Sequence, residues 1–293
     1  MKTAVKKIDK TKRELSIEIT GDVVKNKFED VFAKIAKEAK IPGFRPGNAP
    51  RDILEKKFSS HAHQQVLDEL VPDIYDQAIK QEGLNAVELP NITEVKLDRN
   101  SLSFKAEVEV MPEIEVKNYK GIKVSYQPLS VTTDEVKRHL DTLKESRQVQ
   151  STDDNFAKSL SYPSLSELEK AIERQVLLQK DNAQRQKIEG EIIDGITKDA
   201  DFQLPQALVR RQLDDLVRQA KIDLALKGVP AEKIKEEEKK LTEGLENEAK
   251  RQVKIYLVLA EIARKENIPQ NDQMAHRVME FLFREADWGN SGK

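Results

Sequence analysis

The sequence predicts a small α+β domain at the amino-terminal end, followed by an extended all-α domain. Alternation of apolar and polar residues, typical of half-buried strands, occurs within residues 1–130, and helical spacing of apolar residues dominates from Ser164 onward. Charged residues make up 35% of the chain and aromatic residues 5%, a balance that favours long solvated helices over one thick core. The 293 residues suffice for two domains.

Residues 1–130 are expected to form a small antiparallel sheet with packed helices. Apolar side chains alternate with polar ones over residues 15–19 and 102–110, the pattern of strands with one buried face. The turn residues Asp98-Arg99-Asn100 connect the second strand to an earlier one at about 92–97, which predicts a hairpin.

Two amphipathic helices are predicted on one face of this sheet, over residues 22–40 and 50–83. In the first, apolar residues recur at i, i+3, i+4 and i+7 from Phe28 to Ile35, which is one helical stripe. A further extended piece is expected at residues 121–126.

The segment between these helices, residues 41–50, places an aromatic side chain and an arginine in a loop framed by prolines and glycines. Such a backbone presents its side chains in few directions, and an apolar side chain at a loop tip either folds inward or contacts a partner. From Lys34 to Lys57 there are seven basic and three acidic residues, whereas the whole chain carries a net charge of −2. The local charge indicates an anionic partner, with a solvated helix face as the alternative.

Residues 131–155 are expected to connect the two domains. Thr132 and Glu135 have the spacing of a capping box, so a helix with Leu140 on its apolar side is predicted to begin there. The polar and aperiodic residues 148–155 then predict a linker.

Residues 156–293 are predicted to be helical. Ser164 and Glu167 form a second capping box, Pro205 is placed to start another helix, and Gly228 begins a break before a long helix over residues 231–267. The apolar stripes have two interpretations, namely burial in a helical bundle or incompletely covered patches that accept unfolded chains. Under the second interpretation the substrate-facing residues are Leu257, Leu259, Val278, Phe281 and Leu282.

An enzymatic interpretation has little support. Cysteine is absent, and no phosphate-binding loop or nucleophile motif occurs. His61 and His63 are two residues apart on a predicted helix and face different directions, unlike an i, i+4 metal pair. We therefore expect no catalytic residue, no metal site and no cofactor. No apolar run approaches the length of a membrane span, and the cytoplasm is the expected location.

The loop sequence Gly43-Phe44-Arg45-Pro46-Gly47-Asn48-Ala49-Pro50 resembles the ribosome-binding loop of trigger factor, a bacterial chaperone family that meets nascent chains at the exit tunnel. The likeness extends to the order of strands and helices in residues 1–130 and to the helical segment 162–267. It implies that a ribosomal protein at the tunnel exit and neighbouring rRNA are bound by Gly43, Phe44, Arg45, Pro46, Gly47, Asn48 and Pro50. Asn48 departs from the family pattern, in which lysine is common, and the loss of one cation weakens a salt-dependent contact.

The chain departs from the family plan in its centre. Family members carry a peptidyl-prolyl isomerase domain of the FK506-binding type between the two parts, and here residues 131–155 leave no room for one. The isomerase activity is therefore not expected. The carboxy-terminal end also looks shorter than in the family, so the helical domain at residues 156–293 is expected to be truncated.

The resemblance implies an ATP-independent chaperone that docks on the ribosome and reversibly binds apolar segments of nascent or unfolded polypeptides. It is also compatible with a homodimer that hides the docking loop, and it implies no membrane partner. The alternative is a non-ribosomal holdase or assembly chaperone for folded or oligomeric clients, which would use the helical domain without the loop. An RNA-binding module is disfavoured, because Phe44 alone provides a stacking aromatic among the basic residues of the loop region.

Overall fold

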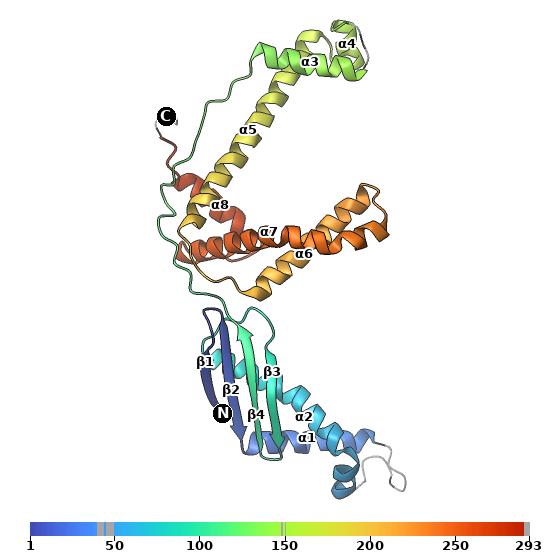
Figure 1. Ribbon diagram of the computed structural model, residues 1–293, viewed down its shortest axis with the longest axis vertical. Helices are drawn as coiled ribbons and strands as arrows, with labels where there is room; N and C mark the ends of the chain where they lie inside the picture. Colours follow the sequence, from blue (N-terminus) through green and yellow to red (C-terminus); the bar gives the residue numbers. More distant parts are fainter. Residues whose placement is uncertain (40–43, 45–49, 148, 150, 290–293) are drawn as a thin grey trace. The chain divides into compact units, whose positions relative to one another are not determined.

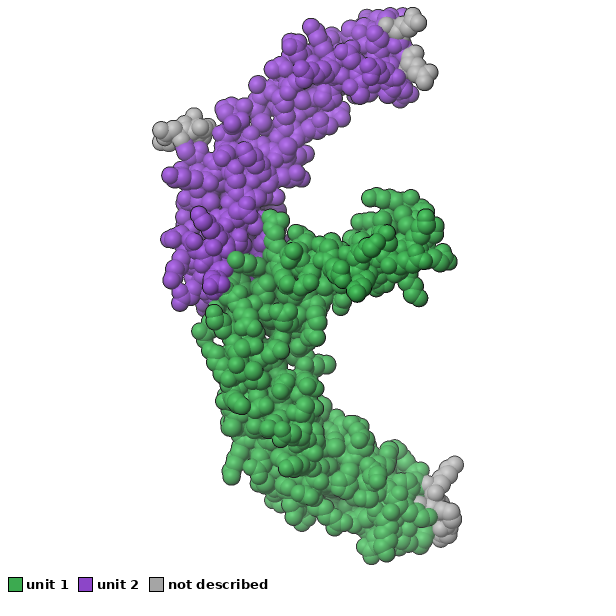
Figure 2. All heavy atoms as spheres, in the orientation of Figure 1, with its two compact units in different colours: residues 1–113, 202–254 green, residues 114–201, 255–293 purple. Residues whose placement is uncertain are grey.

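A computed structural model describes residues 1–39, 44, 50–147, 149 and 151–289. The chain forms two compact units, coloured separately in Figure 2. The first combines residues 1–113 with 202–254, and the second combines residues 114–201 with 255–293. Both units join stretches that are distant in sequence, so they differ from the expected linear boundaries after residues 130 and 155.

The first unit contains a four-stranded antiparallel sheet in the order β1-β2-β4-β3 (Figure 1). Its strands are β1 (Lys2–Lys7), β2 (Lys12–Thr20), β3 (Asn91–Asp98) and β4 (Ser101–Glu109). In the central pair, Leu15 lies opposite Ala106 and Ile17 opposite Phe104, and all four side chains are buried. The alternation in the sequence therefore marks the covered face of the sheet, and the predicted β3–β4 hairpin is confirmed.

The two edge strands differ from the central ones. The strand β1, which the alternation did not predict, contains three lysines among its six residues and is mostly exposed. The register of β3 shifts between Thr93 and Lys96, where Glu94 has a φ of 53°. A bulge of this kind bends the strand and disrupts its regular hydrogen bonding. Both edges are thus poorly suited to pairing with another strand.

The helices α1 (Asp22–Glu38) and α2 (Arg51–Gln81) pack on the apolar face of the sheet, as predicted. The buried stripe of α1 meets the sheet through Phe28, Val31 and Ile35, which join one core with residues of β2 and β4. The helix α2 bends at Phe58, whose φ of −120° and ψ of 15° are not helical. This arrangement fixes the two ends of the segment that connects α1 to α2.

The helices α6 (Gln206–Leu226) and α7 (Ala231–Lys265) are joined by a short turn (Figure 1). The side chain of Gln212 donates to Gln252 at 2.8 Å, and Lys221 pairs with Glu238. Gly228 in the turn has a φ of 82°, a left-handed conformation that glycine adopts without strain. We call α6 and residues 231–254 of α7 the helical arm.

The second unit is built from α3 (Thr133–Arg147), α4 (Asp154–Ser159), α5 (Leu165–Lys198) and α8 (Met274–Glu285), together with the last part of α7. The first predicted capping box is present, because the backbone N–H of Glu135 donates to Thr132 Oγ1 at 3.3 Å and the N–H of Thr132 donates to Glu135 Oε2 at 2.8 Å. The side chain of Ser164 likewise caps α5, through the N–H of Glu167 at 3.4 Å. No helix in the described residues is long and apolar enough to cross a membrane.

The helix α4 replaces the end of the expected polar linker. The carboxylate of Asp153 caps it by accepting hydrogen bonds from the N–H groups of Asn155 and Phe156 at 3.0 and 2.9 Å. The Phe156 side chain is buried in a small core with Leu140 and Leu168. A single aromatic residue thus closes the end of the α3–α5 pair.

The predicted extended piece at residues 121–126 lies outside the sheet. The backbone N–H of Gly121 donates to the carbonyl of Glu285 at 2.9 Å, and that of Val124 to the carbonyl of Asp287 at 3.0 Å. Ile122 packs against α5 at Gly195, where a Cβ atom would lie 2.9 Å from Ile122 Cγ2. A Cβ atom at position 195 would therefore crowd Ile122, and glycine gives this segment room to approach α5.

Two glycines on α5 provide a matched test of this packing. We expect Gly190→Ala to raise stability by about 0.5–1 kcal/mol, because the helix gains propensity and a Cβ there has no neighbour within 4 Å. Gly195→Ala should gain less or lose stability, since Ile122 must move. Thermal unfolding followed by circular dichroism measures both, and the difference should vanish in an Ile122→Ala background. Equal gains for the two variants in the parent chain would contradict this packing.

Candidate functional site

The predicted docking loop lies partly within the described structure. Phe44 is described and its side chain is 40% exposed, and Pro50 is exposed at the start of α2 with φ −58° and ψ 143°. The other predicted docking residues, Gly43, Arg45, Pro46, Gly47 and Asn48, lie outside the described residues. An exposed phenylalanine at this position agrees with the expectation that it is not folded into the core, and its role in docking stays a prediction.

Arg51 connects the two helices at the base of the loop. Its guanidinium group lies 4.0 Å from the centre of the Phe32 ring on α1. It also donates to Glu29 of α1 at 2.9 Å and to Glu55 of α2 at 2.9 Å. The stacking and the two charged hydrogen bonds use the planar fork that lysine lacks, so Arg51 sets the position from which the loop leaves α2.

The carboxylate of Glu55 forms an ion pair with a second arginine. Arg99, in the turn between β3 and β4, pairs with it from the side opposite Arg51. The hydrogen bond from Arg51, together with that from Arg99, lowers the pKa of the Glu55 carboxyl group below its ordinary value. The hairpin turn, α1 and the start of α2 are therefore connected by one chain of ion pairs.

A second ionic contact joins α1 and α2 further from the loop. Glu69 of α2 accepts from Lys27 at 2.7 Å and from Lys34 at 3.0 Å, both on α1. These hydrogen bonds, that from Lys27 first, lower the pKa of Glu69 from 4.5 to about 2. The carboxylate thus stays charged over the whole range in which the protein would function.

Some basic residues near the loop form ion pairs in the structure, so fewer of them are available to a partner than the sequence suggests. Lys34 and Arg51 are occupied by ion pairs with glutamates. Lys37, Lys56 and Lys57 are exposed and have no ion-pair partner among the described residues. These three lysines flank the loop and provide a positive rim of the kind that attracts phosphate groups.

The histidines do not form a metal site. The Nδ1 atom of His63 donates to the backbone carbonyl of Ser59 at 2.8 Å, and its ring meets the ring of Phe28 edge-on at 5.0 Å. His61 is exposed and His63 is partly buried, so the two side chains differ in their surroundings. No group of three metal-ligating side chains occurs in the part of the chain that the structure describes.

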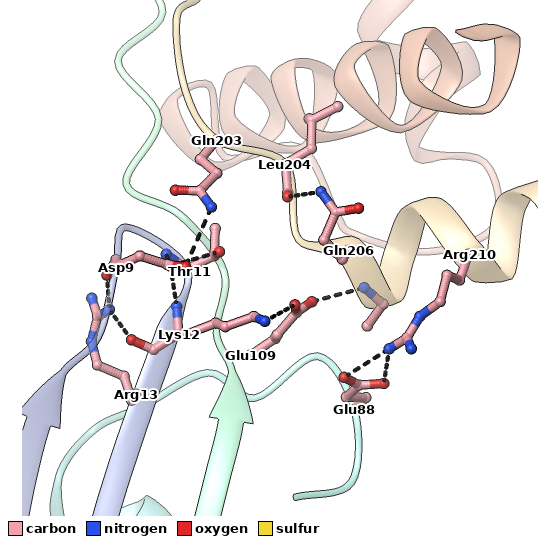
Figure 3. A network of polar contacts seen from close by, with 11 residues as sticks. Asp9, Thr11, Lys12, Arg13, Glu88, Glu109, Gln203, Leu204, Gln206 and Arg210 are labelled. Carbon is pink, nitrogen blue, oxygen red and sulfur yellow. Dashed lines mark hydrogen bonds and ion pairs between the residues drawn. The ribbon is translucent and has the colours of Figure 1, made fainter. Parts of the chain in front are cut away.

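A buried glutamate connects the sheet to the helical arm (Figure 3). Glu109 at the end of β4 is 5% exposed, and its Oε2 atom accepts from the backbone N–H of Ala207, in the first turn of α6, at 2.7 Å. Lys12 of β2 lies 4.0 Å from the other carboxylate oxygen. The free N–H groups and the positive end of the helix dipole stabilise a carboxylate at this position.

Two exposed contacts flank Glu109. Gln203 donates to Asp9 at 3.4 Å, and Arg210 lies 3.3 Å from both carboxylate oxygens of Glu88 (Figure 3). Exposed contacts of this kind each contribute little to stability. This contact between the sheet and α6 is not evident from the sequence, in which Glu109 belongs only to an alternating strand pattern.

The expected substrate-facing residues are mostly buried. Leu257, Leu259, Val278 and Leu282 have at most 5% of their surface exposed. Phe281 is half-buried, with Lys120 at 5.2 Å and Arg284 at 5.6 Å from its ring centre. The first four therefore do not face a client in this structure, because helical spacing marks an apolar stripe without showing whether a neighbouring element covers it.

Exposed apolar side chains occur instead on the helical arm. Ile222 is 48% exposed and Leu226 is 82% exposed, both in the last turns of α6. Two more, Leu177 and Leu178, are exposed on α5 in the second unit. These side chains are large enough to bind apolar segments and too dispersed to form a stable interface by themselves.

The chain is similar to known proteins over most of its length. A family model described as “Bacterial trigger factor protein (TF)” matches residues 1–143, and one described as “Bacterial trigger factor protein (TF) C-terminus” matches residues 164–287. A trigger factor of Solibacter usitatus is 25% identical over an alignment 358 positions long, which covers 89% of this chain and 85% of the relative. A trigger factor of Natranaerobius thermophilus is 35% identical over 147 residues, 50% of this chain and 33% of the relative.

A solved structure shares the fold. It was reported as “Promiscuous Substrate Recognition in Folding and Assembly Activities of the Trigger Factor Chaperone”. The TM-score is 0.58 at 15% sequence identity, over 97% of this chain and 93% of that chain.

These family matches define a molecular chaperone. The chain belongs to the trigger factor family, since two models of that family account in succession for most of its length. Residues 144–163, between the two matches, are too few for a domain, and the central isomerase region of the family has no counterpart there.

The ionic contact of Glu69 predicts an acid-sensitive link between α1 and α2. Because the pKa is lowered from 4.5 to about 2, the stabilisation is present above pH 4.5 and is lost as the pH falls toward 2. Glu69→Gln should therefore lower the melting temperature at pH 6, and its difference from the parent should shrink as the pH approaches 2. Glu237→Gln, on an exposed face of α7, is the control. A difference that is constant with pH would argue against this role.

Proposed function

We propose that this protein is an ATP-independent chaperone that docks on the ribosome near the tunnel exit and reversibly binds apolar segments of nascent polypeptides, in the cytoplasm. The observation that carries the proposal is the exposed Phe44 side chain, which lies between two helices held together by Arg51 and Glu69. A loop whose two ends are fixed loses less conformational freedom on binding than a free one.

Docking on the ribosome has an apolar and an electrostatic part. Phe44 provides the apolar anchor, and Lys37, Lys56 and Lys57 provide positive charge toward rRNA phosphates. The proposed contacts with the ribosomal protein at the tunnel exit and with rRNA are made by Gly43, Phe44, Arg45, Pro46, Gly47, Asn48 and Pro50. The charge contribution makes the affinity fall with salt concentration.

Client binding is assigned to exposed apolar side chains of the helical arm. Ile222 and Leu226 supply modest area, and burial yields only about 25 cal/mol per Å². Weak and dispersed contacts of this kind release a client readily, and they shield the apolar segments that make incompletely folded chains aggregate. No nucleotide is needed for such a cycle.

We further propose that the protein is not a peptidyl-prolyl isomerase. The segment between the two family matches holds the last residues of α3 and the whole of α4. A catalytic pocket for a proline-containing segment requires a domain that this stretch cannot form.

A non-ribosomal holdase or assembly chaperone for folded or oligomeric clients is the second candidate function. The exposed side chains of Ile222 and Leu226 favour it, because their contacts do not depend on the loop. A homodimer that covers the docking loop is compatible with either function.

Ribosome binding is tested by removing the loop side chains. We expect Phe44→Ala combined with Arg45→Ala to reduce co-sedimentation with ribosomes about tenfold or more at physiological salt, since hot-spot side chains contribute about 2 kcal/mol or more. The control is Leu89→Ala combined with Lys96→Ala, which removes an exposed apolar chain and a cation elsewhere on the same unit. Undiminished pelleting of the loop variant would refute docking through this loop and favour the second candidate.

The client surface is tested in an aggregation assay without ribosomes. Ile222→Ser combined with Leu226→Ser should shorten the delay in aggregation of a denatured client, because the largest exposed apolar area on the arm is lost. Val23→Ser combined with Leu89→Ser alters exposed apolar residues outside the arm and should leave the delay unchanged. If the parent chain itself gives no delay, the chaperone function is wrong.

Isomerase activity is tested with a protein whose refolding is limited by proline isomerisation. The uncatalysed phase takes about 10–100 s at 25 °C, and we expect the same rate in the presence of this protein. A rate that rises in proportion to the amount of added chain would contradict the proposed lack of isomerase activity.

A further inference from the structure

A cavity of about 510 Å³ lies in the second unit, between α5, α8 and residues next to them in the chain. Its apolar wall consists of Ile188, Met279 and three aromatic residues, Tyr126, Phe283 and Trp288. None of these residues belongs to the docking loop or to the helical arm. We call this cavity the aromatic pocket. Its size is that of a site for a small molecule.

The aromatic rings of the pocket are held in fixed positions. The rings of Tyr126 and Trp288 meet at 75° with their centres 5.9 Å apart, and those of Phe283 and Trp288 are stacked at 6.3 Å. The indole N–H of Trp288 donates to the backbone carbonyl of Phe283 at 3.1 Å. The polar edge of the indole is therefore satisfied within the protein, and the three rings contribute aromatic surface to the wall of the pocket.

The rim of the pocket has more negative than positive charge. Three carboxylates line it, from Asp181, Glu189 and Glu280, against one guanidinium group, from Arg185. Glu280 lies 3.2 Å from His276, which is charged only when protonated. Asp181 and Glu189 each lie one helical turn from Arg185, yet neither forms an ion pair among the described residues. Two carboxylates thus remain available to a ligand.

Ring faces and carboxylates attract the same kind of ligand. The face of an aromatic ring carries negative potential, so it attracts cations within about 6 Å. A metal ion would need oxygen or nitrogen ligands grouped around one point, and the described residues contain no such group. An ammonium ion with alkyl substituents satisfies both the apolar wall and the acidic rim.

We propose that the aromatic pocket binds a small organic cation, an ammonium group with alkyl substituents on nitrogen. The cation rests against Tyr126 and Trp288, with Glu189 and Asp181 supplying the countercharge. Arg185 opposes binding, because it places a positive charge on the same rim. The proposal is independent of ribosome docking and of client binding.

The single tryptophan of the chain reports on this pocket directly. The full chain is titrated with tetramethylammonium chloride at constant ionic strength, with sodium chloride and neopentyl alcohol, an uncharged molecule of similar shape, as controls. We expect a saturable change in Trp288 fluorescence, with matching heat in a calorimetric titration, for tetramethylammonium alone. The absence of saturable binding in both measurements, or an equal response to the alcohol, overturns the proposal.

Variants separate the proposed contacts from a general effect on folding. Glu189→Gln and Tyr126→Leu should weaken binding about fivefold or more, since each removes a main attraction for the cation. Arg185→Gln should strengthen binding several-fold, a direction that loss of structure does not produce. Glu173→Gln, on α5 outside the pocket, should leave the affinity unchanged. Weaker binding in Arg185→Gln would overturn the assignment.

Discussion

The first turn of α6 meets the buried carboxylate of Glu109, and the arrangement of the first unit depends on this contact. A carboxylate is costly to bury, and here a 2.7 Å hydrogen bond from Ala207 and the positive end of a helix dipole offset that cost. The neighbouring pairs, Asp9 with Gln203 and Glu88 with Arg210, are exposed and individually weak. The strand β4 therefore ends where the helical arm begins, and Glu109 sets the direction in which the arm starts.

Interactions between neighbours in sequence were predictable, and those between distant residues were not. The capping boxes at Thr132 and Ser164 and the breaks at Pro205 and Gly228 follow from contacts within a few residues, and the structure has all of them. The bond from Ala207 to Glu109 spans 98 residues, and nothing in the alternation of β4 distinguishes that glutamate from its neighbours. The strand β1 was missed because its lysines hide the alternation.

The apolar stripes predicted from the sequence are present in the structure, but the sequence does not show which apolar side chains are exposed. Leu257 and Leu282 lie on apolar stripes, and only the tertiary structure shows that both are covered, whereas Ile222 and Leu226 are exposed. The basic residues around the loop show the same difference between the sequence and the structure. Seven basic residues lie in and around the loop in the sequence, whereas in the structure Lys34 and Arg51 form ion pairs that join α1 and α2. Counting residues therefore overestimates both the apolar and the positive surface that a partner can reach.

The edges of the sheet affect how readily this protein could associate with unfolded chains through strand pairing. An open strand edge can act as a template on which unfolded chains add as further strands. Three lysines on β1 and the bulge at Glu94 on β3 make both edges poor templates. A protein that handles unfolded chains meets such strands at high local concentration. The lysines of β1, which lower its strand propensity in the sequence, and the bulge of β3 therefore both disfavour the addition of further strands to this sheet.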